Sequence, residues 1–363
     1  MVAISLIVLF VFINFPEPSE NCDTKLDVIY KEYNCNCSIP TNKLPENCTE
    51  IRKQITEQYN AYAKDKREND YGWVYVATIP VGSAGILFNA LLILVILCDP
   101  LKILHRGAWM TILSLSISDT MACSARVASS VIVKWWDFDL TEKSRIYTEF
   151  FWQFGVNGSF LSLTLLTLQT FMIVKYPVKS RLAMSSGRVV FMIGILWVVS
   201  LGLALPEIDD ISKDTRKYFF VATVSVLEMA TLVQIIVKIL IIREILSPSE
   251  ALRSGIQHKY QREVAKTVII LIFILIVTAL PYFIAKQIEY IRRIKDGSYN
   301  LTIKFPYYYE PIAIANFVAN PIVYSFRLRD YRKSLLFLFF HYKKNKNHAP
   351  LINQSNKTMV TKV

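Results

Sequence analysis

The sequence has few of the residues from which enzyme active sites are usually built. It contains only four histidines, which are scattered along the chain with no spacing that would gather them around a metal ion. Its 11 glycines form no loop of the kind that cradles phosphate groups. We therefore expect that the protein is not an enzyme and binds no organic cofactor.

Acidic residues are in the minority, with 29 Asp and Glu against 41 Lys and Arg, and the formal net charge is +12. Such an excess can indicate a nucleic-acid-binding protein. Here the basic residues lie between long hydrophobic runs and in the C-terminal tail, which favours contact with the headgroups of membrane lipids. We expect lipids as partners, and no nucleic acid.

Long hydrophobic runs dominate the chain, in which 53% of the residues are hydrophobic. A helix needs roughly 20 apolar residues to cross a hydrocarbon core about 30 Å thick, and seven runs are of that order. They lie at about residues 73–98, 108–133, 148–174, 189–205, 218–242, 266–289 and 306–326. Because the intervening loops are short, neighbouring helices should pack side by side. The sequence therefore predicts an all-α membrane protein with a seven-transmembrane helix bundle over residues 72–326.

The first hydrophobic run, Val2 to Phe15, is too short to cross a membrane, and two prolines and a polar segment follow it. This order is typical of a secretory signal peptide, which we predict for residues 1–18. The run has no lysine or arginine before it, so an uncleaved segment that lies in the membrane interface stays the alternative.

Residues 19–71 form a polar segment that we predict to be extracellular. Four of the six cysteines crowd into it, and in an exported chain they predict two disulfides, in any of three pairings. These cysteines are Cys22, Cys35, Cys37 and Cys48. Apolar residues at helical spacing predict one short amphipathic helix between residues 51 and 62.

Glycosylation sequons begin at Asn36 and Asn47, with a weaker candidate at Asn300 in the third outer loop. Positive charges are nearly balanced between the two sides of the membrane and do not orient the chain. The signal peptide, cysteines and sequons do so instead. We predict a multi-pass plasma-membrane protein with an extracellular N-terminus and a cytoplasmic C-terminus.

The chain after the seventh span divides into two parts. Residues 327–342 mix basic with apolar residues, which predicts a short amphipathic helix on the inner membrane surface. Residues 343–363 are polar and should form a cytoplasmic tail. The tail ends Thr361-Lys362-Val363, a pattern typical of the ligands of PDZ domains, so we expect a PDZ protein as a possible partner; a plain disordered end is the alternative.

Several polar residues lie inside the predicted spans. Asp119 is the most costly of them, because a carboxylate at mid-membrane costs roughly 2.5–3.5 kcal/mol on insertion scales. Oxygen atoms that converge on it from several helices could hold a small hard cation such as sodium. The alternative is a hydrogen-bonded polar core in which Asp119 is protonated. The other members of this group are Asn89, Ser159, Asn316 and Asn320.

Five motifs occur in order and in matching spans. The seventh span ends Asn320-Pro321-Ile322-Val323-Tyr324, and the second contains Leu115-Ser116-Ile117-Ser118-Asp119. The first, fourth and sixth spans contribute Asn89, Trp197 and Pro281. With these residues the chain from 73 to about 340 resembles the rhodopsin-like class of G-protein-coupled receptors.

This resemblance implies partners and roles. The partners are an extracellular ligand and a heterotrimeric G protein. The family's sodium pocket would consist of Asp119, Ser159, Asn316, Asn320 and Asn89. The activation movement would involve Pro281, Pro321 and Tyr324.

The chain also departs from the family. Where the family carries Asp-Arg-Tyr at the G-protein interface, this sequence reads Gln169-Thr170-Phe171, so the arginine that normally meets the G protein is missing. We therefore expect weak or constitutive coupling. Ala279 replaces the sixth-span tryptophan, and no cysteine follows Cys123, so the usual outer-loop disulfide is absent. In its missing disulfide, its short second outer loop and the continuation Ser325-Phe326-Arg327-Leu328-Arg329, the chain resembles the branch of melanocortin, adenosine, cannabinoid and lysophospholipid receptors.

Charged and aromatic residues near the outer ends of the spans are candidates for a ligand cavity. They are Arg126, Glu149, Trp152, Lys286 and Glu310. Trp152 stands where amine receptors carry an aspartate, so a peptide or a charged lipid is favoured over a monoamine. The resemblance implies that positions 126 and 310 face the bundle interior, where unpaired charges are costly, so we predict an ion pair between Arg126 and Glu310. The alternative is that each side chain snorkels to the lipid headgroups.

Two functions are consistent with these patterns. The first is a cell-surface receptor that passes ligand binding on to a G protein. The second is a non-signalling seven-helix protein that scavenges ligand or scaffolds other receptors, which the Gln169-Thr170-Phe171 triplet favours. No internal repeat or pair of interrupted helices points to a transporter.

Overall fold

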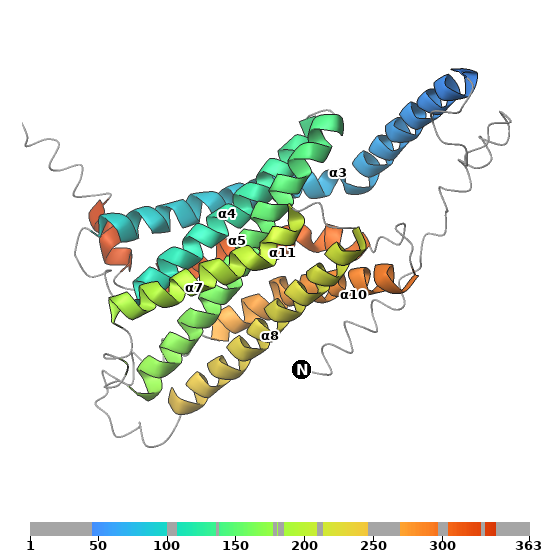
Figure 1. Cartoon of the computed structure of the whole chain (residues 1–363). Coiled ribbons are helices and arrows are strands. Elements are labelled where there is room, and N and C mark those ends of the chain that lie inside the picture. Colours follow the sequence, from blue (N-terminus) through green and yellow to red (C-terminus); the bar gives the residue numbers. More distant parts are fainter. Residues whose placement is uncertain are drawn as a thin grey trace, which may run out of the picture.

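The structure is a computed structural model that describes residues 46–99, 107–135, 138–176, 180, 185–208, 213–245, 269–296, 304–327 and 331–338. Every element among these residues is helical, and the long helices pack into one bundle (Figure 1). The prediction of an all-α seven-transmembrane bundle is confirmed.

Seven helical segments correspond, in order, to the seven predicted spans. They are α3 (Glu46–Cys98), α4 (Gly107–Trp135), α5 (Phe138–Lys175), α7 (Ser186–Ala204), α8 (Lys213–Ile245), the segment from residue 269 through α10 (Leu280–Asp296), and α11 (Lys304–Arg327). A short 3-10 helix, η2 (Leu205–Glu207), continues α7. The sixth segment is interrupted by a turn at Ala279, immediately before α10 begins.

Five of the described helices are long and apolar enough to cross a membrane, judged by length and composition. These stretches are Gly72–Cys98, Ser144–Lys175, Ser186–Glu207, Tyr218–Ile245 and Ile269–Arg292. The two remaining helices, α4 and α11, are more polar because they turn polar faces to the bundle interior, where Asp119 and Asn320 are buried. Their polarity therefore reflects a central position and not a place outside the membrane.

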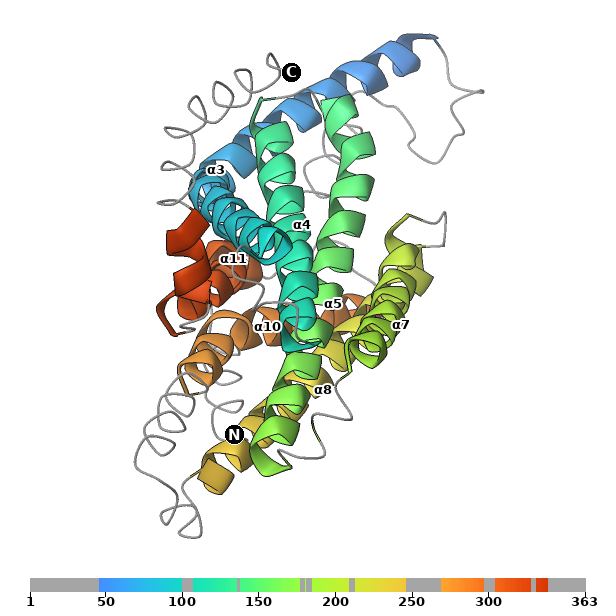
Figure 2. The same cartoon turned by 90° about the vertical axis from the view of Figure 1, so that its left-hand side faces the viewer.

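The first helix is longer than predicted. Instead of a short separate helix between residues 51 and 62, α3 continues outward without interruption to Glu46, and this part projects beyond the bundle (Figures 1 and 2). The sequence from 46 to 71 contains neither glycine nor proline, so nothing in it terminates a helix. At the outer end of the span, Trp73 stacks on Tyr308 of α11 with ring centroids 5.7 Å apart.

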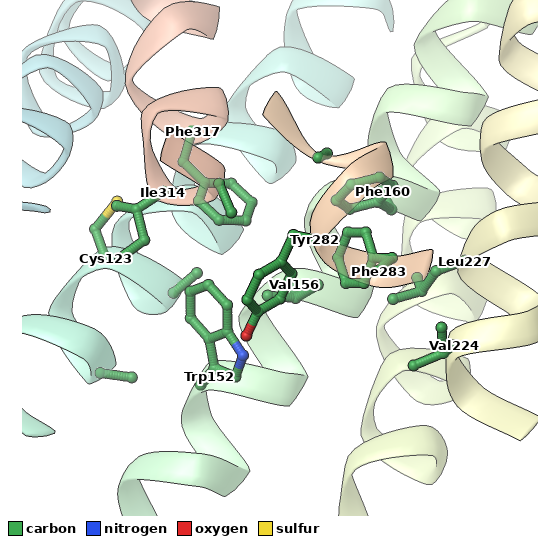
Figure 3. Close-up of a cluster of buried hydrophobic side chains, with 14 of the residues drawn as sticks. Cys123, Trp152, Val156, Phe160, Val224, Leu227, Tyr282, Phe283, Ile314 and Phe317 are labelled. Atoms are coloured by element: carbon green, nitrogen blue, oxygen red, sulfur yellow. The ribbon is translucent and has the colours of Figure 1, made fainter. Parts of the chain in front are cut away.

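A buried cluster joins five helices of the bundle, namely α4, α5, α8, the sixth helix and α11 (Figure 3). Trp152 of α5 meets the ring of Phe317 of α11 edge to face at 5.8 Å, and Phe160 of α5 meets Phe283 of α10 in the same way at 5.1 Å. Leu227 brings α8 into the same cluster. Such aromatic pairs have preferred geometries, and they fix how α5, α10 and α11 are rotated against each other.

The helices α4 and α5 approach each other closely at Gly155. A Cβ atom at that position would lie 2.6 Å from the backbone nitrogen of Ala122 and 2.9 Å from the carbonyl oxygen of Ser118. Only glycine fits there, as is common where membrane helices are in backbone contact. This contact sets the depth of α4 against α5, and with it the positions of the polar residues on both.

A further helical stretch follows α11 at residues 331–338. Tyr331 and Ser334 are buried, while Arg332 and Lys333 between them are exposed. Tyr331 packs in a cluster with Tyr324 of α11 and with apolar residues of α3 and α4. The stretch is amphipathic, as predicted for residues 327–342, but the described helix is shorter than that range.

Candidate functional site

The buried carboxylate of Asp119 is bonded to two other helices. Ser159 of α5 donates a hydrogen bond of 2.5 Å from its Oγ to Oδ1, and Asn320 of α11 donates one of 2.9 Å from its Nδ2 to Oδ2. Asp119 has no exposed surface, and Ser159 and Asn320 are also buried. Three of the five residues predicted for a sodium pocket are therefore in direct contact.

The other two predicted residues connect α11 to its neighbours. Asn89 of α3 donates hydrogen bonds from Nδ2 to the carbonyl oxygens of Gly85, at 2.9 Å, and of Phe317, at 3.0 Å. Asn316 accepts a 3.3 Å hydrogen bond at its Oδ1 from Thr278 of the sixth helix. Both asparagines are buried in the same region, where they hold α11 between α3 and the sixth helix.

Two buried oxygen atoms in this polar core have no hydrogen-bond partner within the described part of the chain. They are Oδ1 of Asn89 and the hydroxyl of Tyr324. Like the carboxylate of Asp119, both are oxygen atoms, the donors that hard cations prefer and that also suit buried water. The residues fit a sodium ion, and sodium stays a prediction.

A second polar layer fixes α4 against α5 and α7. The hydroxyls of Ser114 and Ser162 are hydrogen-bonded at 3.0 Å, and Trp197 of α7 donates to Ser114 from its indole Nε1 at 3.0 Å. The tryptophan recognised in the fourth span therefore packs against α4. Farther along, Thr111 donates to Oε1 of Gln169 at 3.1 Å.

Arg126 is the centre of a charge cluster at the outer ends of α4, α5 and α11. Its Nη1 and Nη2 donate to the two carboxylate oxygens of Glu149, at 2.7 and 3.2 Å. Its Nε lies 3.3 Å from Oε1 of Glu310, close enough for an ion pair but without hydrogen-bond geometry. The guanidinium also lies 4.3 Å from the ring centroid of Trp152. The predicted pairing with Glu310 is confirmed, but the bidentate partner is Glu149.

Lys286 belongs to a second charged pair on α10. Its Nζ lies 3.3 Å from Oε2 of Glu289 and 4.2 Å from the ring centroid of Tyr307. Glu289 is fully buried, and sequence reasoning missed it, although its position three residues after Lys286 is the spacing at which helical side chains meet. Among the predicted cavity residues, only Lys286 makes no described contact with Arg126.

Prolines in the sixth and seventh helices leave carbonyl groups without a backbone N–H donor. Side chains from other helices donate hydrogen bonds to these carbonyl groups instead. Pro321 has no N–H for the carbonyl of Phe317, which accepts from Asn89 instead. Pro281 likewise leaves the carbonyl of Val277 free, and the hydroxyl of Tyr309 of α11 donates to it. Tyr309 directly precedes the cluster residue Glu310, so the charge cluster and the interruption of the sixth helix are connected through two adjacent residues.

The residues predicted for a G-protein interface lie near the C-terminal end of α5. Gln169 is buried and bonded to α4, so it does not face the cytoplasm. The hydroxyl of Thr170 donates to the carbonyl of Leu166 in its own helix at 2.8 Å. Phe171 packs against residues of α8. None of the three contributes a charge.

Several predicted features lie outside the described residues. They include the signal peptide, Cys22, Cys35, Cys37, the sequons at Asn36 and Asn300, and the C-terminal tail. Of Asn47 and Cys48 only the backbone is described, in the first turn of α3.

The seven helices, the polar core between them and the prolines of the sixth and seventh helices are the features of a seven-transmembrane receptor. Residues 88–324 match the rhodopsin family of seven-transmembrane receptors over more than half of the chain. The protein belongs to this family, which is a family of receptors and not of enzymes. It is also similar to a QRFP-like peptide receptor of Branchiostoma floridae, with 21% identity over 287 residues that cover 70% of this chain and 73% of that protein.

Proposed function

We propose that this protein is a plasma-membrane receptor that binds an extracellular peptide and passes the signal to a heterotrimeric G protein. The N-terminus is outside and the tail is in the cytoplasm. Ligand and G protein would both prefer one arrangement of the helices, so each favours binding of the other. The observation that carries the ligand side is the buried cluster of Arg126, Glu149 and Glu310.

The cluster is unevenly paired, and a ligand can therefore bind its more weakly held carboxylate. Glu149 occupies both terminal nitrogens of Arg126, whereas Glu310 makes an ion pair without hydrogen-bond geometry. A cationic group of a ligand, such as a lysine, an arginine or a free amino terminus, can displace Glu310 from Arg126 without breaking the stronger pair. Because Tyr309 is bonded to Val277, movement of Glu310 would reach the sixth helix directly.

A peptide is favoured over a charged lipid for two reasons. The outer ends carry cations and carboxylates on several helices, which suits a ligand with several polar groups. The relative in Branchiostoma floridae carries the name of a peptide receptor. At 21% identity this name supports a ligand class and no particular peptide.

The experiment is a signalling assay in cells that express the full chain, challenged separately with peptide and lysolipid libraries. A peptide response that Glu310→Gln weakens at normal surface level supports the proposal. Glu244→Gln, on the inner part of α8, is the matched control and should leave peptide binding unchanged. A response to lysolipids alone would replace the peptide by a charged lipid.

A non-signalling scavenger or receptor scaffold is the second candidate, and the inner end of α5 favours it. Gln169 and Thr170 are engaged within the bundle and supply no charge to a partner. Peptide uptake at the cell surface with no response of any second messenger would decide for this candidate.

We also propose that Asp119, Ser159, Asn320, Asn89 and Asn316 hold a sodium ion in the resting receptor. Three observations support this proposal: an all-oxygen donor set, full burial and the two unpartnered oxygens. On the outside we propose a signal peptide, two disulfides, and glycans at Asn36 and Asn47. Glycosidase treatment of the cell-expressed protein should increase its mobility on a gel.

A further inference from the structure

Lys238 of α8 is a buried cation without a described counter-ion. It is only 2% exposed, and its Nζ has no hydrogen-bond partner in the described part of the chain. This distinguishes it from Arg126 and Lys286, both of which lie against carboxylates. A charged group inside a membrane bundle is costly, so an unpaired one calls for a function.

The position of Lys238 excludes the usual explanation of an intramembrane lysine. Lysines near helix ends extend along the helix to the headgroups, but Lys238 lies about two turns before α8 ends at Ile245. It lies on the same face of α8 as Leu227, Gln234 and Ile241, all of which are buried. Its side chain therefore belongs to the inward face of the helix.

Lys238 lies at the depth of the inner end of α5. One turn before it, Gln234 donates from Nε2 to the hydroxyl of Thr164 at 2.9 Å. One turn after it, Ile241 and Ile242 belong to an apolar cluster with Phe171 and Val174 of α5. Because α5 and α8 are the third and fifth spans, they run in the same direction. Lys238 is therefore level with the residues between Thr164 and Phe171.

This level includes Thr170, the position at which the family carries its arginine. Thr170 follows Ser159 by 11 residues and Trp152 by 18, so the helical repeat places all three on one face of α5, from which Ser159 contacts α4 and Trp152 contacts α11. Its hydroxyl is bonded within α5. At this depth, α5 carries no charge at position 170, and the neighbouring α8 carries one, on Lys238, that has no partner among the described residues.

We propose that Lys238 supplies from α8 the positive charge that α5 lacks, and that it binds a carboxylate of the cytoplasmic partner when the inner ends of the helices separate. While the inner ends are closed, the ammonium group has no anion among the described residues, and this favours opening. With a partner present, it gains a charge-assisted contact. The inference rests on the proposed function, because it assumes that a partner binds on this side.

The test compares Lys238→Met, which removes the charge at similar volume, with Lys238→Arg, which keeps it. Arg243→Met is the matched control, because Arg243 lies on the same helix and is exposed. The purified full-length receptors are measured by nucleotide exchange on a panel of heterotrimeric G proteins. We expect Lys238→Met to lower exchange about tenfold or more, as for loss of one charge-assisted contact. Lys238→Arg and Arg243→Met should remain near wild type.

A rescue experiment separates the proposed role from general damage. Thr170→Arg, added to Lys238→Met, returns a positive charge to the same level from α5 and should restore part of the lost exchange. Exchange by Lys238→Met at the wild-type rate would overturn the proposal. An equal loss in Arg243→Met, or no rescue by Thr170→Arg, would overturn it as well.

Measurements on the receptor without a G protein test the role of Lys238 separately from the proposed function. Spin labels at Ile173 and Ile269, both exposed, report the separation of the inner ends of α5 and the sixth helix, in a Cys98→Ser background. Lys238→Met should shift the distances toward the closed form and raise the melting temperature. If wild type activates no G protein, the proposed function fails, and unchanged distances in Lys238→Met would then overturn the role of Lys238.

Discussion

Replacement of Arg126 by methionine should be the most damaging single change at the outer charge cluster. It leaves two carboxylates without their shared cation, and breaking a buried pair in this way costs about 3–5 kcal/mol. The side chain of Glu149 is still 35% exposed, so it can turn toward water. We therefore expect the lower end of that range, about 3 kcal/mol.

The two carboxylates should differ in their contributions, because their contacts with Arg126 differ. Glu149 accepts two charge-assisted hydrogen bonds, and Glu149→Gln should cost about 1.5–3 kcal/mol. Glu310 contributes an ion pair at 3.3 Å without hydrogen-bond geometry, so Glu310→Gln should cost less than Glu149→Gln. The expected order of destabilisation is Arg126→Met, then Glu149→Gln, then Glu310→Gln.

Thermal unfolding of the purified receptors, together with surface levels in cells, measures this order. Charge exchange is the sharper assay. Arg126→Glu with Glu149→Arg should recover more surface expression than Arg126→Glu with Glu310→Arg, because each exchange leaves one pair of facing carboxylates but only the first rebuilds the pair that has two hydrogen bonds. Equal losses in Glu149→Gln and Glu310→Gln, or no recovery in either exchange, would refute the reasoning.

Sodium should raise the melting temperature of the purified receptor by mass action, and Asp119→Asn should abolish the increase. Equal melting in sodium and in a large organic cation would show that no sodium binds. Tyr309→Phe leaves the carbonyl of Val277 unpaired, at a cost of about 1–3 kcal/mol. It should lower the melting temperature and raise basal signalling, because this bond between the sixth helix and α11 is lost; Tyr218→Phe, on the exposed surface, should do neither. A peptide of the C-terminal residues should bind a PDZ domain, and binding that does not depend on Val363 would contradict this.

The seven helices and their order were predictable because a membrane span must be apolar over its whole length. The outer part of α3 was not, because a polar helix outside the membrane has no such requirement. Only the four apolar residues between Ile51 and Tyr62 indicated it, and they marked a part of the helix and not its limits. The absence of glycine and proline from residues 46 to 71 was the better guide to the length of α3.

Contacts between helices were predictable only where a buried charge needed an oppositely charged partner, because an unpaired charge there would cost too much free energy. The ion pair of Arg126 with Glu310 was inferred because both charges had to face the interior. The stronger partner, Glu149, depends on how α5 is rotated and how deep it lies, which are set by contacts such as that of Gly155 with α4. Lys238 gave no sequence pattern at all, since a single lysine in a long apolar run does not show which way it points.

The hydrogen bond from Tyr309 to Val277 has a consequence for the evolution of the receptor. Pro281 leaves the carbonyl of Val277 without a backbone donor, and the hydroxyl of Tyr309 is needed as a donor only while the proline is present. If Pro281 changes to a residue with an N–H, the carbonyl is satisfied within the sixth helix and the phenol loses its partner. The two positions should therefore covary among orthologous receptors: chains that keep the proline should keep a hydroxyl donor at position 309, and chains that lose one should be free to lose the other.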